Sequence, residues 1–396
     1  MRKLSVISFT VLFAVAWIGF FASDALAIPS FARRYGVNCN KCHTQIPQLT
    51  ADGIQFKQNG YRQPDEVGKL IWEEEIFPIG ALFKIRYNFT TPNKEGKPDK
   101  SFFDPHELEL FAGGTMGPNI SYFFDVEAKT PGKGKNAAVD EPFRINAFYV
   151  IFDDLLLDKN RINLKAGRIR NEYLHFSDHL KLTAEGYLCG CVTFVRDGIE
   201  INGLVPVGPG GLHYAGGVVN DQTGINNVDN NFRSPYGWAS YTYKDQTIGV
   251  RAIYTPTKAG QDITKPTENQ TQFDTFFKLS FNEAIYDFGL SDINPSYLLF
   301  SFTTENDVGG KAGVDRRSYI VEPTIFLGDK WDAILRYELT DDPDKSGTND
   351  RYLISFAFHP VPNVRLFAEY MHTEMREDAA AKTREDRLRM GVLLAF

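Results

Sequence analysis

The sequence predicts an all-β fold: a transmembrane outer-membrane β-barrel of about 16 antiparallel strands, preceded by a small N-terminal module. Three observations predict it. The chain opens with an export signal, segments of about ten residues alternate apolar with polar side chains, and the connections between these segments are alternately long and short.

The composition excludes two classes of protein. Beyond the first two dozen residues there is no apolar run of about 18 residues, which excludes a bundle of membrane-spanning helices. The 43 basic and 50 acidic residues give a net charge of −7, so the chain has no general basic field and no nucleic-acid partner is expected. Aromatic residues make up 14% of the chain, as expected if they form girdles at two membrane surfaces.

Residues 1–27 have the pattern of a secretory signal peptide. Arg2 and Lys3 precede an apolar stretch from Leu4 to about Ala22, and Ala25-Leu26-Ala27 supplies small residues for cleavage before Ile28. The length of the stretch leaves an uncleaved anchor as the alternative. In both cases the chain is expected to leave the cytoplasm.

The next segment carries the most specific motif in the sequence. Cys39-Asn40-Lys41-Cys42-His43 has the spacing of a c-type haem attachment site, in which two thiols bind the porphyrin and the following imidazole ligates the iron. A redox Cys-x-x-Cys needs no trailing His and usually lies in a βαβ context, which is absent here. We therefore expect one covalently attached haem c, with Cys39 and Cys42 as thioether positions and His43 as the proximal axial ligand.

The residues around this motif carry a family resemblance. They are Pro29 to Val37 before the motif and, after it, Ile46-Pro47-Gln48-Leu49, Gly53, Phe56-Lys57 and Asn59-Gly60-Tyr61. Residues 28 to about 62 resemble the N-terminal module of the fused monohaem cytochrome–porin family, whose better-known members serve neutrophilic iron-oxidising bacteria. The resemblance implies a haem module (28–75) ahead of an outer-membrane barrel and, as substrate, extracellular Fe(II).

Residues 76–396 read independently as a porin-like barrel. Lipid-facing apolar and lumen-facing polar residues alternate through 79–89, 120–127, 331–339 and 387–396. In the second of these segments, Ile120, Tyr122 and Phe124 alternate with Ser121 and Asp125. A soluble β-sandwich gives similar alternation, but its chain rarely ends on an exposed Phe such as Phe396.

The connections favour the membrane barrel over the sandwich. Long connections are expected near 90–106, 130–142, 169–197, 221–235, 255–270, 303–317, 340–350 and 372–386. Short ones are expected near 115–118, 153–160, 205–211, 244–246, 282–296, 327–330 and 360–362, and the 282–296 connection contains apolar residues that could hide a further strand. Long outer loops and short periplasmic turns are typical of bacterial outer-membrane barrels, with both termini in the periplasm.

A barrel of about 16 strands is wide enough to leave an aqueous channel. Residues 28–75 are too few to build a core of their own, so a bound haem is expected to supply much of the missing apolar volume. Because this module is tethered directly to the first strand, we expect it to lie in or against the periplasmic mouth of the barrel, as a monohaem cytochrome c-like plug.

The module contains no second His, so the distal ligand of the iron is expected from elsewhere. His175 and His179 are the candidates, because they lie in the longest loop, between the fifth and sixth strands, and in general porins that loop folds inward. His213 and His359 compete, being near the periplasmic strand ends, and Lys57, Lys69 or water remain open. The same loop carries Cys189 and Cys191, whose separation by one residue would strain an internal disulfide.

These features predict an outer-membrane electron-transfer protein. Its partners would be a periplasmic redox carrier, such as a soluble cytochrome c, an extracellular donor or acceptor, and outer-membrane lipid. Acidic groups such as Asp341 and Glu374 suit Fe(II) weakly and more often serve solubility, so iron oxidation depends on the resemblance. Three alternatives stay open: electron export to an extracellular acceptor, a solute porin with the module as structural plug or redox gate, and a soluble periplasmic haem enzyme.

Overall fold

The computed structural model describes most of the barrel and of the module before it. The described residues are 30–38, 41–45, 48–63, 66–73, 78–92, 98–129, 143–156, 160–170, 183–188, 195–220, 232–244, 246–256, 269–281, 296–308, 313–328, 330–342, 347–361, 363–377 and 383–395. Residues 1–27, the predicted signal peptide, and Phe396 lie outside them. Within them, no helix is long and apolar enough to cross a membrane.

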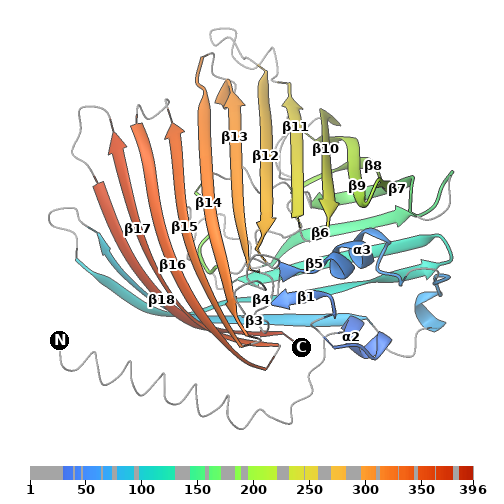
Figure 1. Ribbon diagram of the computed structural model, residues 1–396, viewed down its shortest axis with the longest axis horizontal. Helices are drawn as coiled ribbons and strands as arrows, with labels where there is room; N and C mark the ends of the chain where they lie inside the picture. The colour runs from blue at the N-terminus through green and yellow to red at the C-terminus, as the bar shows by residue number, and fades with distance from the viewer. Residues whose placement is uncertain are drawn as a thin grey trace.

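Short elements precede the barrel. They are α2 (Ser30–Tyr35), the paired strands β1 (His43–Gln45) and β2 (Gln48–Leu49), α3 (Ala51–Gln58) and the 3-10 helix η3 (Ile71–Glu73). We call residues 30–73 the module. In Figure 1 its helices lie beside the blue and cyan strands that begin the barrel.

Sixteen antiparallel strands form one closed barrel, which confirms the predicted all-β barrel and its number of strands (Figure 1). They are β3 (Ile79–Pro92), β4 (Lys100–Gly117), β5 (Ile120–Lys129), β6 (Phe143–Phe152), β7 (Asn163–Arg170), β8 (Val195–Val207), β9 (Gly210–Asn220), β10 (Phe232–Tyr243), β11 (Gln246–Thr255), β12 (Gln270–Ser280), β13 (Tyr297–Asn306), β14 (Arg316–Leu327), β15 (Trp331–Asp342), β16 (Gly347–Val361), β17 (Val364–Glu377) and β18 (Thr383–Ala395). Each strand pairs with its sequence neighbours, and β18 pairs with β3 from Ala395 opposite Leu82 to Glu385 opposite Pro92, which closes the sheet.

Burial in the barrel is inverted relative to a soluble protein. On β15, Asp332 and Arg336 are buried, whereas Trp331 and Leu335 are 39% and 49% exposed. On β5, Ser121 and Asp125 are likewise buried and alternate with the apolar residues. Polar side chains therefore face the lumen and apolar ones the outside, as predicted, and this pattern stabilises a barrel in lipid.

The lumen is less uniformly polar than expected. On the wall formed by β9–β15, lumen-facing residues form a buried apolar cluster. Its members are Ala215, Val219, Tyr236, Trp238, Ile253, Phe276, Tyr297, Leu299, Ile320, Phe326 and Ile334. On this side, therefore, the described residues line the lumen with apolar and not only with polar side chains.

The strands follow one another around the barrel in sequence order, so the long and the short connections lie at opposite ends, as predicted. Several strands extend further than predicted. β4 begins at Lys100, inside the connection expected at 90–106, and acidic positions placed in loops, such as Asp341 and Glu374, belong to β15 and β17. Residues 282–295 lie outside the described residues, but β12 and β13 pair directly with each other, so no barrel strand is inserted between them.

Candidate functional site

The second half of the predicted haem-attachment motif lies against helix α3. The Thr50 side chain caps α3 by accepting a hydrogen bond from the Gly53 N–H (3.2 Å), and its hydroxyl donates to the Lys41 carbonyl (2.7 Å). The Thr50 N–H donates to the Cys42 carbonyl (3.0 Å). A side chain at position 53 would collide with that carbonyl, so glycine lets the helix approach the motif. The start of α3 and the motif are therefore fixed to each other.

Cys42 and His43 are both half-buried, and His43 lies opposite Leu49 in the β1–β2 pair. A thiol followed directly by an imidazole is the donor chemistry that a c-type haem requires on this side of its motif. The residues present fit that group. Cys39, the other expected thioether position, lies outside the described residues.

An aromatic stack connects the module to the lumen wall. Phe31 packs parallel to Tyr61 with ring centroids 5.4 Å apart, and Tyr61 packs on Phe123 of β5 at 5.3 Å. Phe123 in turn contacts Tyr149 of β6, whose hydroxyl lies 3.0 Å from that of Tyr61. The barrel thus supplies two aromatic side chains to the core of the module, which is too small to form one alone.

Polar contacts fasten the same part of the module to the short-turn end of the barrel. Arg62 donates to the Pro118 carbonyl in the β4–β5 turn (2.9 Å) and to Asp154 after β6 (3.3 Å). Lys69 and Thr115 of β4 exchange two hydrogen bonds, of 3.0 Å and 2.8 Å. The described module residues therefore lie at the end of the barrel that the sequence analysis assigned to the periplasm.

Asp153, next to Asp154, is buried beneath this contact. It lies 3.7 Å from Arg62, and Gly60 approaches it so closely that a side chain there would contact its carboxylate. Burial raises the pKa of Asp153 to about 6, against the opposing charge of Arg62. Gly60 has φ +64°, a conformation that glycine adopts readily.

Farther into the barrel, residues 183–188 of the β7–β8 connection reach the opposite wall; we call them the inward segment. Its backbone is held by side chains of β15–β17, of which Glu369 is buried and Arg351 is half-buried. The Ala184 and Glu185 N–H groups donate to Glu369 (2.9 and 3.0 Å), and Arg351 donates to the Gly186 carbonyl (2.9 Å). The described part of the connection between the fifth and sixth barrel strands, residues 183–188, therefore lies inside the barrel, where the sequence led us to expect this loop.

Glu185 occupies the centre of a basic cluster on that wall. Arg387 lies 2.9 Å from its carboxylate, Arg389 also pairs with it, and Arg351 lies at 3.9 Å. Burial alone would raise the pKa of Glu185, but the charges of Arg389, Arg351 and Arg387 outweigh it and lower the pKa below the ordinary value. Glu185 is thus held as a carboxylate that neutralises part of the basic wall.

An acidic wall lies across β4 and β5, on the long-loop side of Phe123. It is formed by Glu107, Glu109, Asp125 and Glu127, each at most 4% exposed. Lys84 pairs with Glu107, and Arg170 pairs with Asp125 at 2.5 Å. Neither oxygen of Glu109 has a hydrogen-bond partner in the described structure. Fully ionised, the four carboxylates would exceed these two paired cations by two charges.

The predicted distal ligands cannot be placed. His175, His179, Cys189 and Cys191 lie outside the described residues. Of the competing histidines, His359 lies 2.6 Å from Asp332, which also contacts Arg365 at 3.4 Å, and all three are buried. His213 is buried on β9. Among the described residues, no group of three or more His, Cys, Asp or Glu side chains is arranged to hold a metal ion.

Sequence reasoning missed the residues that fasten the module and the inward segment. Two of them left a signal, because Phe123 and Tyr149 are aromatic side chains at lumen-facing positions, where a polar residue is expected. The anchors Arg62 and Glu369 left no such signal in the sequence, since charged residues are common both in loops and on the lumen face of a barrel.

The barrel resembles solved outer-membrane channels. The outer-membrane channel DcaP of Acinetobacter baumannii superposes with a TM-score of 0.57 and 10% identity, over 80% of this chain and 96% of that one. The anion-selective porin from Comamonas acidovorans gives 0.55 and 14%, over 80% and 98%. The chain has a porin-like fold. No family model and no curated protein matches this porin-like chain, and the likeness concerns the fold alone.

Proposed function

We propose that this chain is an outer-membrane barrel of the porin type whose module closes the periplasmic end of the lumen. The inverted burial supports the membrane assignment, because exposed Leu335 and buried Arg336 suit lipid outside and water inside. The observation that carries the plug is the Tyr61 stack on Phe123 and Tyr149, which holds the module against the lumen wall. Both termini would then lie in the periplasm.

We propose that the function of this plugged barrel is electron transfer by a covalently bound haem c. Cys39 and Cys42 would hold it and His43 would be an axial ligand; when bound, the group accepts and releases one electron at a potential set by its surroundings. Thr50 fixes the motif to α3, and the aromatic stack packs the module against the lumen wall. The Cys39–His43 spacing is the observation that favours this function.

The thickness of the membrane determines how many redox partners this function requires. One redox group cannot by itself cover a hydrocarbon layer about 30 Å thick, so carriers must approach from both sides. A periplasmic carrier such as a soluble cytochrome c would meet the module, and an extracellular partner would enter past the inward segment. Fe(II) as donor rests on the family resemblance, and electron export to an extracellular acceptor fits the same arrangement.

The second candidate is a solute porin in which the module is a structural plug or redox gate. The porin-like fold supports this candidate more directly than it supports electron transfer, because the solved neighbours bear on the barrel and not on the module. A soluble β-sandwich enzyme is no longer a candidate, since the sheet closes into one barrel.

Two measurements on the full chain separate the candidates. Peroxidase staining after denaturing electrophoresis should detect a covalent haem in the natural protein and none in a Cys39→Ala/Cys42→Ala variant. Planar bilayers should show the holoprotein nearly silent. Large steady currents would favour the solute porin, and absence of covalent pigment would end the electron-transfer proposal.

A further inference from the structure

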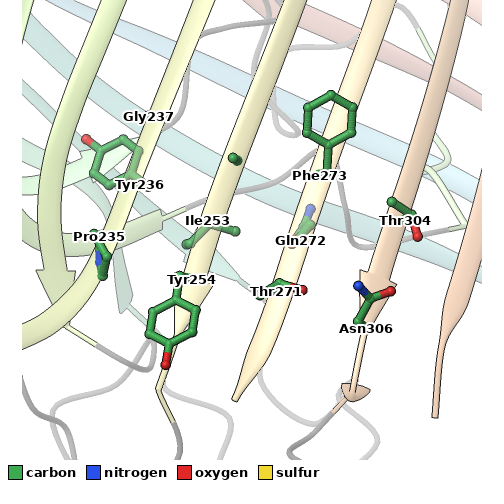
Figure 2. Close-up of a pocket in the computed structure, with 11 residues that line it drawn as sticks. Pro235, Tyr236, Gly237, Ile253, Tyr254, Thr271, Gln272, Phe273, Thr304 and Asn306 are labelled. Carbon is green, nitrogen blue, oxygen red and sulfur yellow. The ribbon is translucent and has the colours of Figure 1, made fainter. Parts of the chain in front are cut away.

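The outer face of the barrel carries a hollow of about 400 Å³ across four strands (Figure 2). This volume lies within the range of small-ligand sites, about 300–1,000 Å³. Tyr236, Ile253 and Gln272 contribute to the lining from the positions between the outward residues. The other eight lining residues lie two apart on their strands, so they share the outer face. These pairs are Pro235 and Gly237, Ala252 and Tyr254, Thr271 and Phe273, and Thr304 and Asn306. We call this hollow the groove.

Strand register explains its shape. Gly237 lies opposite Ala252, and Ala252 lies opposite Phe273, so two small residues sit side by side next to an aromatic ring. In the next row Tyr254 lies opposite Thr271. A Cβ built at Gly237 would meet only the Ala215 carbonyl, at 3.5 Å, so the space outside this glycine is open. Gly237 and Ala252 thus form the bottom of the groove, and the rings of Phe273 and Tyr254, which are 45% and 37% exposed, rise beside them.

The groove opens at the long-loop end of the barrel, where two arginines flank it. Arg317 lies opposite Thr304, is exposed, and forms no ion pair within the described chain. Arg233 precedes Pro235 by two residues at the same end of β10 and donates to the Pro256 carbonyl (3.2 Å). An apolar trough therefore leads to a rim of uncharged polar groups and two cations.

We propose that this groove binds a lipid A molecule of the outer leaflet, with an acyl chain beside Gly237 and Ala252 and a phosphate at Arg317 and Arg233. The inference rests on the proposed membrane insertion. The apolar lining faces the hydrocarbon, and cations at a membrane surface attract anionic head groups. The long-loop end places the groove in the outward leaflet. The complementary charge favours this occupant over a second copy of the chain.

Native mass spectrometry of the detergent-purified full chain, titrated with lipid A, tests this site. Gly237→Leu fills the groove and should weaken binding about tenfold, because about two methylenes of contact are lost. Arg317→Gln should weaken it about fivefold. Ala239→Leu, at the next outward position on β10, and Arg376→Gln, at the long-loop end of β17, are the matched controls and should bind as the natural protein does.

Each other result overturns the inference. Equal binding by all variants would place lipid A elsewhere, and oligomers that disappear only in Gly237→Leu would show that a second copy covers the groove. Folding of each variant is checked by its mobility before and after heating. Flotation with liposomes separates the two proposals: an inserted barrel without this lipid site refutes only the site, whereas failure to float refutes membrane insertion as well.

Discussion

At the scale of single residues, Asp153 should make the docking of the module depend on pH. Its pKa lies at about 6 in the folded protein against 3.8 ordinarily, first because of burial. Between these values the folded state holds a proton that the unfolded chain has lost, so stability falls as pH rises through this window. The shift corresponds to about 3 kcal/mol.

Asp153→Asn should remove this dependence, because the amide resembles the protonated carboxyl and leaves Asp154 to pair with Arg62. Urea unfolding at pH 5 and pH 7 measures it. The natural protein should gain stability at pH 5 relative to pH 7, and the variant should gain less. The same gain in both proteins would show that Asp153 is not the group responsible.

A substitution at Glu109 tests whether the negative charge of the acidic wall destabilises the fold. Both carboxylate oxygens of Glu109 are buried, and its neighbour Asp125 is a second acid. Glu109→Gln should therefore raise the free energy of unfolding at neutral pH, by about 1–3 kcal/mol, because a buried uncompensated charge is costly. Urea titration in detergent measures the change.

Glu338→Gln is the matched control and should have the opposite sign. Glu338 is equally buried, but it accepts the Leu188 N–H and lies 3.6 Å from Arg336. Removing its charge leaves a buried arginine with less compensation, which destabilises the fold. Loss of stability in both variants would contradict the distinction between the two carboxylates.

At the scale of elements, the inward segment should be released by loss of a single anchor. Glu369 receives two of its backbone N–H groups, and hydrogen bonds to a charged acceptor contribute about 1.5–3 kcal/mol each. Glu369→Ala should therefore increase protease cleavage of the β7–β8 connection several-fold. Thr373→Ala, on the same strand and equally buried, should leave it unchanged. Equal protection in both variants would mean that other contacts suffice.

The strands were the most predictable elements. The alternation through Ser121 and Asp125 predicted which side chains of β5 face the lumen. The succession of long and short connections predicted that the strands pair in sequence order and close into a barrel. The prediction failed beyond the hydrocarbon layer: around Asp341 and Glu374 both faces of a strand can meet water, so alternation disappears although pairing continues. Strand ends there depend on backbone hydrogen bonds, which leave no trace in side-chain polarity.

The candidate site was predictable only in part. The Cys39–His43 motif is local in sequence, so its spacing alone indicates its chemistry. The contacts that hold the module join Tyr61 to Phe123 and Arg62 to Pro118 across more than 50 residues, and such pairings follow from barrel closure. An aromatic residue at a lumen position was the one available signal.

At the scale of the whole molecule, two segments contact the lumen wall at different levels. The module lies at the short-turn end, and the inward segment is held by Glu369 and Arg351 on the wall farther in. Acidic residues of β4 and β5 and basic residues of β16–β18 line different sides of the space. The proposed plugged barrel with charged walls would differ physically from an open pore, because solutes would meet both steric and electrostatic barriers.

Tyr61 tests whether the module is what closes the barrel. Tyr61→Ala removes the ring between Phe31 and Phe123 and should cost about 3–5 kcal/mol of docking free energy. In planar bilayers the full-length variant should then show intermittent currents where the natural protein is nearly silent. Tyr61→Phe keeps the stack, loses only the hydroxyl contact with Tyr149, and should stay close to silent. If Tyr61→Ala folds, as judged by heat-dependent mobility, and still passes no current, then the inward segment or another part of the chain closes the lumen without the module.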